Sequence, residues 1–410
     1  MFESQHRLRH LPFFEELASR DEGAPEWRTA MAGMVVLRLV DAWLEDGAAV
    51  VGGDAWGLRS VDNAIEAVDE GTPIRAILGR VVVALLERKP DIHVVISPLM
   101  AYAQALEYDA KWTLAADVYH SVLAHLHPVD DSDASIGAHL RLGQCYRNLH
   151  RLDDASEAFV SAAEIATAVG DLVGVLRARV GEGRLAIVRG NLPKAEEILD
   201  DAIVRATSAD LRDVRSRALH ERSNVAQLRG QYELAIQLAY DALGHSQSST
   251  ERDRILSDIA VTFMDLGVFS AARDAYLVLS TTAQEEYVRW AAELNLLEIS
   301  SQTGAEILFE QHRQQLVGKK LPPFLATGFQ LSLGLGYQRF GNEPRARFHL
   351  EQALALAGEH GINQLLFDAE EALFALSAPT PPLRAERAVP LEIEEVANAI
   401  RDMREAVGAA

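Results

Sequence analysis

The sequence predicts an all-α protein, a right-handed solenoid of antiparallel helix pairs. Three observations predict it. Four alanines stand 40 residues apart, at Ala115, Ala155, Ala195 and Ala235. The residues around them recur at fixed offsets, and a helix-breaking corner precedes the later ones. Self-similarity at such a period is the signature of stacked helical repeats, in which each unit buries its apolar face against its neighbours.

The stretch RGNLPKAEEILDDAI, residues 189–203, shows what one corner contains. Gly190 tolerates the left-handed backbone conformation that ends a helix. Pro193 suits the first turn of a new helix, where its missing N–H costs nothing. Glu196 and Glu197 then lie near the positive end of that helix dipole. The stretch is therefore predicted to be the turn between helix A and helix B of one pair.

The same pattern recurs about seven times between residues 92 and 376. Small residues at fixed positions let the two helices of a pair approach closely, and large apolar residues fill the gaps between pairs. Beyond Ala235 the spacing changes but the pattern continues, at Ala272 and Ala346. A weaker copy lies around Ala305 and Phe309.

These residues resemble the tetratricopeptide repeat family. The match is to its pattern of small and aromatic residues, carried in one copy by Gly143, Tyr146, Leu152, Ala155, Phe159 and Ala162. The family's usual period is 34 residues, whereas several copies here are about 40 residues long. The extra residues lengthen either the helices or the loops between units. Repeats of that length resemble those of kinesin light chains and bacterial peptide-pheromone receptors.

The flanking parts divide the chain further. We expect an N-terminal segment (1–25), a helical region of degenerate repeats (26–91), the solenoid (92–376), a proline-rich linker (377–390) and an amphipathic C-terminal helix (391–410). The helical region is expected to hold helices at 26–45, 55–69 and 73–89. The C-terminal helix carries an apolar stripe at helical spacing: Ile393, Val396, Ala397, Ile400 and Val407. It is interpreted either as a cap on the last repeat or as a tethered helix that binds a partner or the protein's own groove.

Composition excludes several classes of function. The net charge is −21, and the first 100 residues hold 10 Lys and Arg against 16 Asp and Glu. A nucleic-acid or membrane-surface role is therefore disfavoured. The most apolar window, residues 31–44, is too short for a bilayer and contains Arg38 and Asp41. With a single cysteine and no signal-peptide pattern, the expected location is the cytoplasm.

Three stretches offer chemistry, and each has a simpler interpretation. The first could bind a metal but reads as a solvated connector: His120, His125, His127, Asp130, Asp131 and Asp133. Gly181-Glu-Gly183 superficially matches a dinucleotide loop, yet no strand precedes it, so the glycines fit close helix packing. Cys145 lies inside a helix A and is expected to be a packed residue. We therefore expect no enzyme activity, no metal and no cofactor.

The concave face of the solenoid offers a binding surface. Positions counted from the small residue of each helix A are expected to point into a groove. Those positions are rich in Arg, Asn and Gln: Gln144, Arg147, Asn148, Arg177, Arg184, Arg217, His220, Asn224, Gln227, Arg254, Ser257, Gln338 and Arg339. Arginine grips carboxylates through two parallel hydrogen bonds. The alternative is that these side chains form salt bridges with acids of neighbouring helices.

The sequence thus predicts a non-catalytic scaffold or adaptor that binds a partner peptide or helix, acidic or with a free carboxylate. The expected contact residues are Arg147, Asn148, Arg177, Arg184, Arg217, His220, Asn224 and Arg254. The alternative function is a cytoplasmic signalling receptor whose solenoid senses a small peptide or metabolite. The identity of the partner and the oligomeric state stay open.

Overall fold

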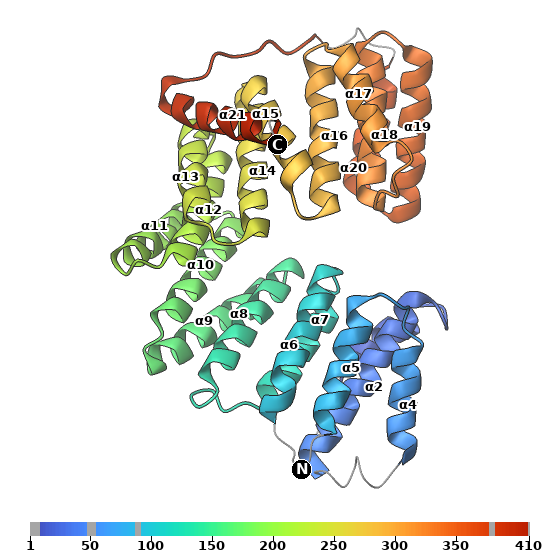
Figure 1. The fold of residues 1–410 in the computed structure, drawn as a ribbon, viewed down its shortest axis with the longest axis vertical. Helices are drawn as coiled ribbons and strands as arrows, with labels where there is room; N and C mark the ends of the chain where they lie inside the picture. The colour runs from blue at the N-terminus through green and yellow to red at the C-terminus, as the bar shows by residue number, and fades with distance from the viewer. Residues whose placement is uncertain (1–8, 47–54, 87–91, 377–381, 409–410) are drawn as a thin grey trace. The chain divides into compact units, whose positions relative to one another are not determined.

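Every regular element of the part of the chain that the structure describes is a helix, as predicted (Figure 1). The structure is a computed structural model that describes residues 9–46, 55–86, 92–376 and 382–408. The chain divides into two compact units, residues 1–198 and 199–410, and the boundary falls inside one helix. The sequence did not predict a boundary there.

Unit 1 begins with the helices that precede the clear repeats. These are α1 (Leu11–Ala18), α2 (Pro25–Asp46), α4 (Ala55–Glu66) and α5 (Pro73–Leu85). The last three start within one residue of the predicted helices, and α4 and α5 end three to four residues earlier than predicted. The repeats follow as α6 (Ile92–Tyr108), α7 (Trp112–Ala124), α8 (Ser132–Asn148), α9 (Leu152–Val169), α10 (Leu172–Val188) and the start of α11 (Leu192–Ser208).

Unit 2 continues the series of helix pairs from the rest of α11. Its helices are α12 (Arg212–Leu228), α13 (Tyr232–His245), α14 (Ser249–Leu266), α15 (Phe269–Thr282), α16 (Glu286–Gln302), α17 (Glu306–Leu316), α18 (Pro323–Arg339), α19 (Glu343–His360) and α20 (Asn363–Ala375). Helix A of a pair has an even number from α6 to α18, and helix B has the next odd number. A 3₁₀ turn, η1 (Leu391–Ile393), and α21 (Glu394–Gly408) end the described chain.

The predicted corner between helix A and helix B recurs seven times. At each one a single residue has a positive φ of 55° to 85°: Ala110, His150, Gly190, Gly230, Gly267, Gly304 and Gly341. The next residue donates its N–H to a carbonyl five residues earlier, as from Asn191 to Ala186 at 2.9 Å. This bond satisfies a carbonyl that the end of the helix would leave unpaired. The prediction that one corner is repeated about seven times is confirmed.

The small residue five positions after each corner is buried where helix B crosses helix A. Ala115, Ala155, Ala195 and Ala235 are 0–2% exposed. The weak copy departs from this rule, because Phe309 occupies the alanine's position after Gly304 and is itself fully buried. Its ring lies where a side chain at Gly336 of α18 would be, since a Cβ there would meet Phe309 Cε2 at 2.3 Å. A glycine on the facing helix therefore compensates for the large residue.

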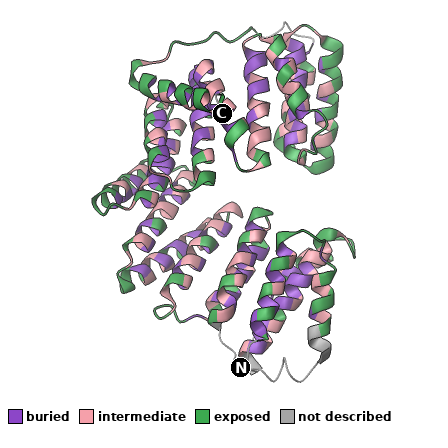
Figure 2. Cartoon of the chain, viewed as in Figure 1, coloured by how far each residue is buried: buried purple, intermediate pink, exposed green. Residues whose placement is uncertain are grey.

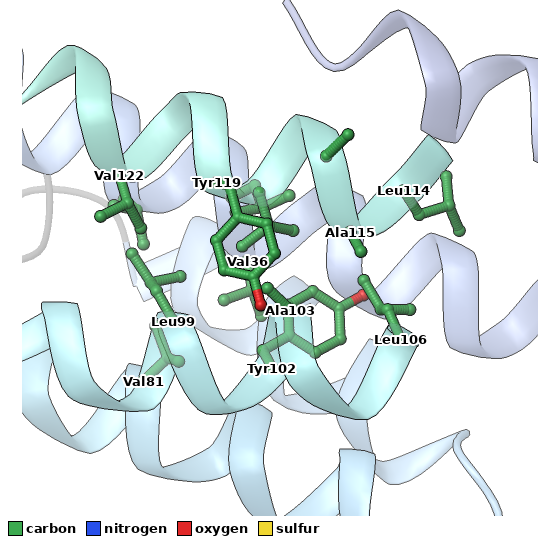
Figure 3. Close-up of a cluster of buried hydrophobic side chains, with 14 of the residues drawn as sticks. Val36, Val81, Leu99, Tyr102, Ala103, Leu106, Leu114, Ala115, Tyr119 and Val122 are labelled. Carbon is green, nitrogen blue, oxygen red and sulfur yellow. The ribbon is translucent and has the colours of Figure 1, made fainter. Parts of the chain in front are cut away.

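Burial follows the helices of each unit as an inward-facing stripe (Figure 2). In unit 1 the core combines the N-terminal helices with the first pairs, and Tyr102 and Tyr119 are fully buried within it (Figure 3). Figure 3 shows Val36 and Val81 beside residues of α6 and α7. The region 26–91 therefore shares one core with the start of the repeats rather than forming a core of its own.

The length of a repeat varies through helix B and the loop that follows it, since α7 has 13 residues in a 40-residue repeat and α13 has 14 residues in a 37-residue repeat. The A helices from α6 to α18 all have 17 or 18 residues, whereas the B helices range from 11 residues in α17 to 18 in α9 and α19. The spacing of the corners is 40 residues from Ala110 to Gly230 and 37 residues from Gly230 to Gly341. The sequence left open whether helices or loops take up the extra residues.

The C-terminal segment returns to the middle of unit 2. Residues 382–390 are extended, as the linker prediction implies, and residues 377–381 of that prediction lie outside the described residues. Helix α21 packs mainly on α15, with further contacts to α13, and lies beside α15 in Figure 1. Ile393, Val396, Ala397 and Ile400 are buried there. The interpretation of this helix as a cap on the last repeat is wrong.

Candidate binding surface on the A helices

All eight predicted contact residues lie on A helices. Unit 1 holds Arg147 and Asn148 on α8, and Arg177 and Arg184 on α10. Unit 2 holds Arg217, His220 and Asn224 on α12, and Arg254 on α14. The repeat register that selected these residues therefore assigns them to the right class of helix. That they line one groove stays a prediction.

In unit 1 the candidates lie on two A helices that contact each other, α8 and α10. Arg177 is exposed and Arg184 is half-buried. The two are seven residues apart and thus share one face of α10. On α8, Arg147 donates to the Asn148 side chain at 3.0 Å, which fixes the two candidates against each other.

The net charge of α8 and α10 together is opposite in sign to that of the whole chain. Helices α8 and α10 together carry five arginines, namely Arg141, Arg147, Arg177, Arg179 and Arg184. Their carboxylates are only Asp133 and Glu182, so five minus two gives +3 in a chain of −21. Arg179 lies 3.0 Å from Glu182, and Arg141 lies 3.4 Å from Glu107. A local excess of guanidinium groups attracts carboxylates despite the overall charge.

In unit 2, His220 is not available to a ligand. It is 1% exposed, and its ring nitrogens lie 2.6 Å from Asp258 and 3.4 Å from Glu251, both on α14. Burial by itself would lower the pKa of His220, but hydrogen bonds to these two carboxylates raise it to about 9. The imidazole is therefore charged at neutral pH and joins α12 to α14. Its predicted role as a direct contact is not supported by this burial.

The other unit 2 candidates also have acidic partners. Arg217 lies 3.2 Å from Asp213, and Arg254 lies 3.7 Å from Glu251. Asn224 donates to Glu221 at 3.5 Å. These partners lie on the candidate's own helix, whereas the alternative that the sequence left open was salt bridges with acids of neighbouring helices.

A stripe of acids on α14, which was not predicted from the sequence, also faces α12. Glu251, Asp258 and Asp265 are seven residues apart and face α12, where they accept from His220 and Gln227. Helix α14 has four carboxylates against two arginines. The seven-residue spacing was the available signal.

The last two candidates are part of the framework of unit 2. Arg339 donates to the Ser301 hydroxyl of α16 at 2.9 Å, and burial lowers its pKa. Gln338 is buried and donates to the Ala375 carbonyl at 3.2 Å. Both side chains join α18 to neighbouring helices.

The histidines of the stretch 120–133 each have a different partner. His127 pairs with Asp130 at 3.0 Å, whereas His125 lies 3.5 Å from Asp41 of α2 and His120 is bonded to Tyr146. In the described ranges, no three His, Cys, Asp or Glu side chains lie close enough to hold a metal ion.

The two remaining candidates for chemistry are packing residues. Cys145 is fully buried, and that burial raises the pKa of its thiol to about 12, so it is not a thiolate at neutral pH. At Gly181 a Cβ would meet the Phe159 ring at 2.5 Å. The prediction of close helix packing at this glycine is confirmed.

Comparisons with known proteins give no family assignment. No family model matches the chain, and no curated protein matches it. Among solved structures it is similar to the apo form of the quorum sensor NprR from B. thuringiensis, with 13% identity and a TM-score of 0.48 over 79% of this chain and 97% of that one. It is also similar to the Rap conjugation gene regulator of the plasmid pLS20 in complex with the Phr* peptide, with 12% identity and a TM-score of 0.45 over 87% and 98%.

A tetratricopeptide repeat protein from Parabacteroides merdae is similar as well, with 12% identity and a TM-score of 0.34 over 83% and 99%. All three TM-scores lie below 0.5, so the helix-pair architecture is established by this chain's own helices and corners. No helix among the described residues is long and apolar enough to span a membrane.

Proposed function

We propose that the chain is a non-catalytic binding protein whose helices α8 and α10 take up an acidic peptide or a partner segment with a free carboxylate. The observation that carries the proposal is the excess of arginine on these two adjoining helices, +3 in a chain of −21. Guanidinium groups bind carboxylates through paired, charge-assisted hydrogen bonds. The single cysteine is buried and reduced, which suits the cytoplasm.

The contact residues that we assign to this surface are Arg147, Asn148, Arg177 and Arg184. Arg177 and Arg184 face the same way on α10, and the Arg147–Asn148 pair presents a donor group from α8. In unit 2, Arg217 and Arg254 contribute less, because α12 and α14 together carry six arginines against six carboxylates and therefore no net positive charge. His220 holds α12 against α14 and makes no direct contact.

The test is affinity capture from the native cell lysate with charge-reversed variants. Arg177→Glu with Arg184→Glu is expected to reduce capture of the partner at least ten-fold, which corresponds to about 1.4 kcal/mol. The matched control is Arg205→Glu on α11, a helix B, where a half-exposed arginine lies 3.6 Å from Asp201. Helical circular dichroism should be unchanged in both variants.

Charge reversal at Arg217 compares the contribution of unit 2 to partner capture with that of unit 1. Arg217→Glu is expected to weaken capture less than Arg184→Glu does, because α12 and α14 together lack the excess of arginine that α8 and α10 have. Capture that survives the Arg177 and Arg184 reversals would refute the assignment to α8 and α10.

A further inference from the structure

The C-terminal strap, residues 382–408, is bound to unit 2 as a peptide ligand would be. Its extended part pairs with successive A–B corners through backbone hydrogen bonds. The Arg384 N–H donates to the Gln302 carbonyl at 2.9 Å, and the Arg387 N–H donates to the Gly267 carbonyl at 3.0 Å. Three extended residues cover roughly 10 Å, which matches the spacing of packed helices. Three residues of the strap therefore span the distance from one A–B corner to the next.

Side chains of the strap contact the same corners. The Arg384 guanidinium lies 5.2 Å from the centre of the Phe269 ring and donates to the Gln302 side chain at 3.2 Å. Glu386 accepts from both the backbone N–H and the hydroxyl of Ser270, at 3.0 and 2.8 Å, in the first turn of α15. A carboxylate is favoured at this end of a helix by the dipole and the unpaired N–H groups.

The glycines of these corners make room for the strap. A Cβ at Gly304 would meet Leu383 at 2.7 Å, and one at Gly267 would meet the Arg387 side chain at 3.3 Å. At Gly190, Gly230 and Gly341 a Cβ would meet nothing within 4 Å. The two strap-bearing corners thus differ from corners of identical backbone geometry.

The helical part of the strap binds through one narrow face. Ile393, Val396, Ala397 and Ile400 follow the spacing i, i+3, i+4, i+7 and are at most 6% exposed. Gln237 of α13 donates to the Glu392 carbonyl at 2.7 Å and thereby fixes the start of the helix. This is the helix-in-groove mode of peptide recognition, added here to an extended segment.

The strap does not fill the whole surface to which it binds on unit 2. Beyond Ile400, a cleft of about 550 Å³ lies between α15 and the end of α21, lined by Leu277, Thr281, Arg404, Glu405, Val407 and Gly408. The buried Nε of Arg404 has no hydrogen-bond partner and lies 3.5 Å from Asp274. Residues 382–388 are exposed although they are bonded to the corners. The two corners close their own hydrogen bonds without the strap, at 2.9 Å and 2.8 Å.

We propose that the surface under the strap, formed by α13, α15 and the corners at Gly267 and Gly304, is a second docking site. Its ligand is an extended segment with two arginines three residues apart, followed by an amphipathic helix with the 393–400 spacing. This chain's own strap occupies the site in cis, so a partner segment of the same pattern binds by displacing it. The site is independent of the surface on α8 and α10.

The test uses the full chain and a labelled synthetic peptide with the sequence of residues 382–408. Val396→Asp with Ile400→Asp in the chain's own strap should open the site, so that this variant binds the peptide at least ten-fold more tightly than the unmodified chain does. The control variant, Asn398→Asp with Ala406→Asp, adds the same charge to exposed positions of α21 and should bind as the unmodified chain does. A peptide that carries the two Asp substitutions should not bind the opened chain.

Two results would overturn the proposal. One is that the opened chain keeps its cooperative unfolding, followed by Trp290, yet binds the peptide no better than the unmodified chain. The other is that the opened chain loses the fold of unit 2, which would make α21 an integral part of the core. Amide hydrogen exchange of the unmodified chain gives an independent check. Residues 394–408 should exchange at least ten-fold faster than α15, and equal protection contradicts a displaceable strap.

Discussion

The repeats that start at the corners His150 and Gly190 differ from those that start at Gly230 and Gly267 in the length of one helix only, helix B. In the first group the B helices α9 and α11 have 18 and 17 residues; in the second, α13 and α15 have 14 each. The A helices of both groups have 17 or 18 residues. The corner spacing falls from 40 to 37 residues accordingly.

The two groups end helix B in different ways. After α9 and α11 the chain turns through a left-handed residue, Gly170 or Asp210, whereas α13 and α15 end at extended residues, Ser246 and Ala283. The corners and A helices are unaffected because their hydrogen bonds are local to each pair. Between these two groups, helix B is thus the part of the repeat that changes length. The C-terminal strap binds where the B helices are short, on α13 and α15.

The largest effect is expected from two buried phenylalanines, one in each unit. Phe159 of α9 packs on Gly143 and Gly181, and Phe309 of α17 packs on Gly336. Replacement of either by Ala should lower the free energy of unfolding by about 3–5 kcal/mol, because it leaves a cavity. Denaturant unfolding measures the loss, and Trp290, the only tryptophan after residue 198, reports unit 2.

A second substitution sharpens this comparison. Gly336→Leu alone should destabilise the chain, since its side chain would overlap the Phe309 ring. In the Phe309→Ala background the same leucine should recover part of the loss. Purely additive costs would show that the ring and the glycine do not compensate for each other.

A smaller effect is expected from the two buried histidines, one in each unit. His10 lies 2.6 Å from Asp117 and 3.2 Å from Asp41, and these bonds outweigh its burial and raise its pKa to about 9, as for His220. A raised histidine pKa stabilises the fold fully below about pH 6.5, and this contribution is lost as pH rises toward 9. Each site should contribute at most about 3 kcal/mol.

The pH profile of unfolding checks this expectation in each unit. For Glu251, burial by itself would raise the pKa, but the His220 bond and nearby arginines lower it to about 2, so its contribution is lost only as pH falls from 4.5 toward 2. Unit 2 should therefore be most stable between pH 4.5 and 6.5. His220→Gln should flatten the alkaline decline in unit 2 and leave that of unit 1 unchanged. An equal alkaline decline in the variant would exclude His220 as its source.

The smallest effect is expected at the corners. All three corners added at 37-residue spacing have glycine, whereas two of the earlier ones have Ala110 and His150 at φ near 55°. Ala110→Gly should stabilise the chain by about 1 kcal/mol, because a side chain is strained in this conformation. Gly230→Ala should destabilise it by a similar amount, although a Cβ there meets no atom within 4 Å. Shifts of the same sign in the two variants would contradict this account.

The sequence by itself determined the helix pairs and their corners. A glycine followed by a capping residue and a buried alanine acts within about 15 residues, so its pattern is legible in the chain, as in the stretch around Gly190. The same local logic placed all eight candidate contacts on A helices. It also identified Cys145 and Gly181 as packing residues, because their neighbours in the repeat specify the environment.

Tertiary structure decided which of those contacts are available and where the C-terminal segment binds. His220 is held by Glu251 and Asp258, which are 31 and 38 residues away on the next pair. Arg387 reaches Gly267 across 120 residues of sequence. The apolar stripe of α21 predicts a buried face but does not select among the apolar surfaces that could cover it. Such pairings depend on the charges and shapes that stacked repeats bring together, which local periodicity does not encode.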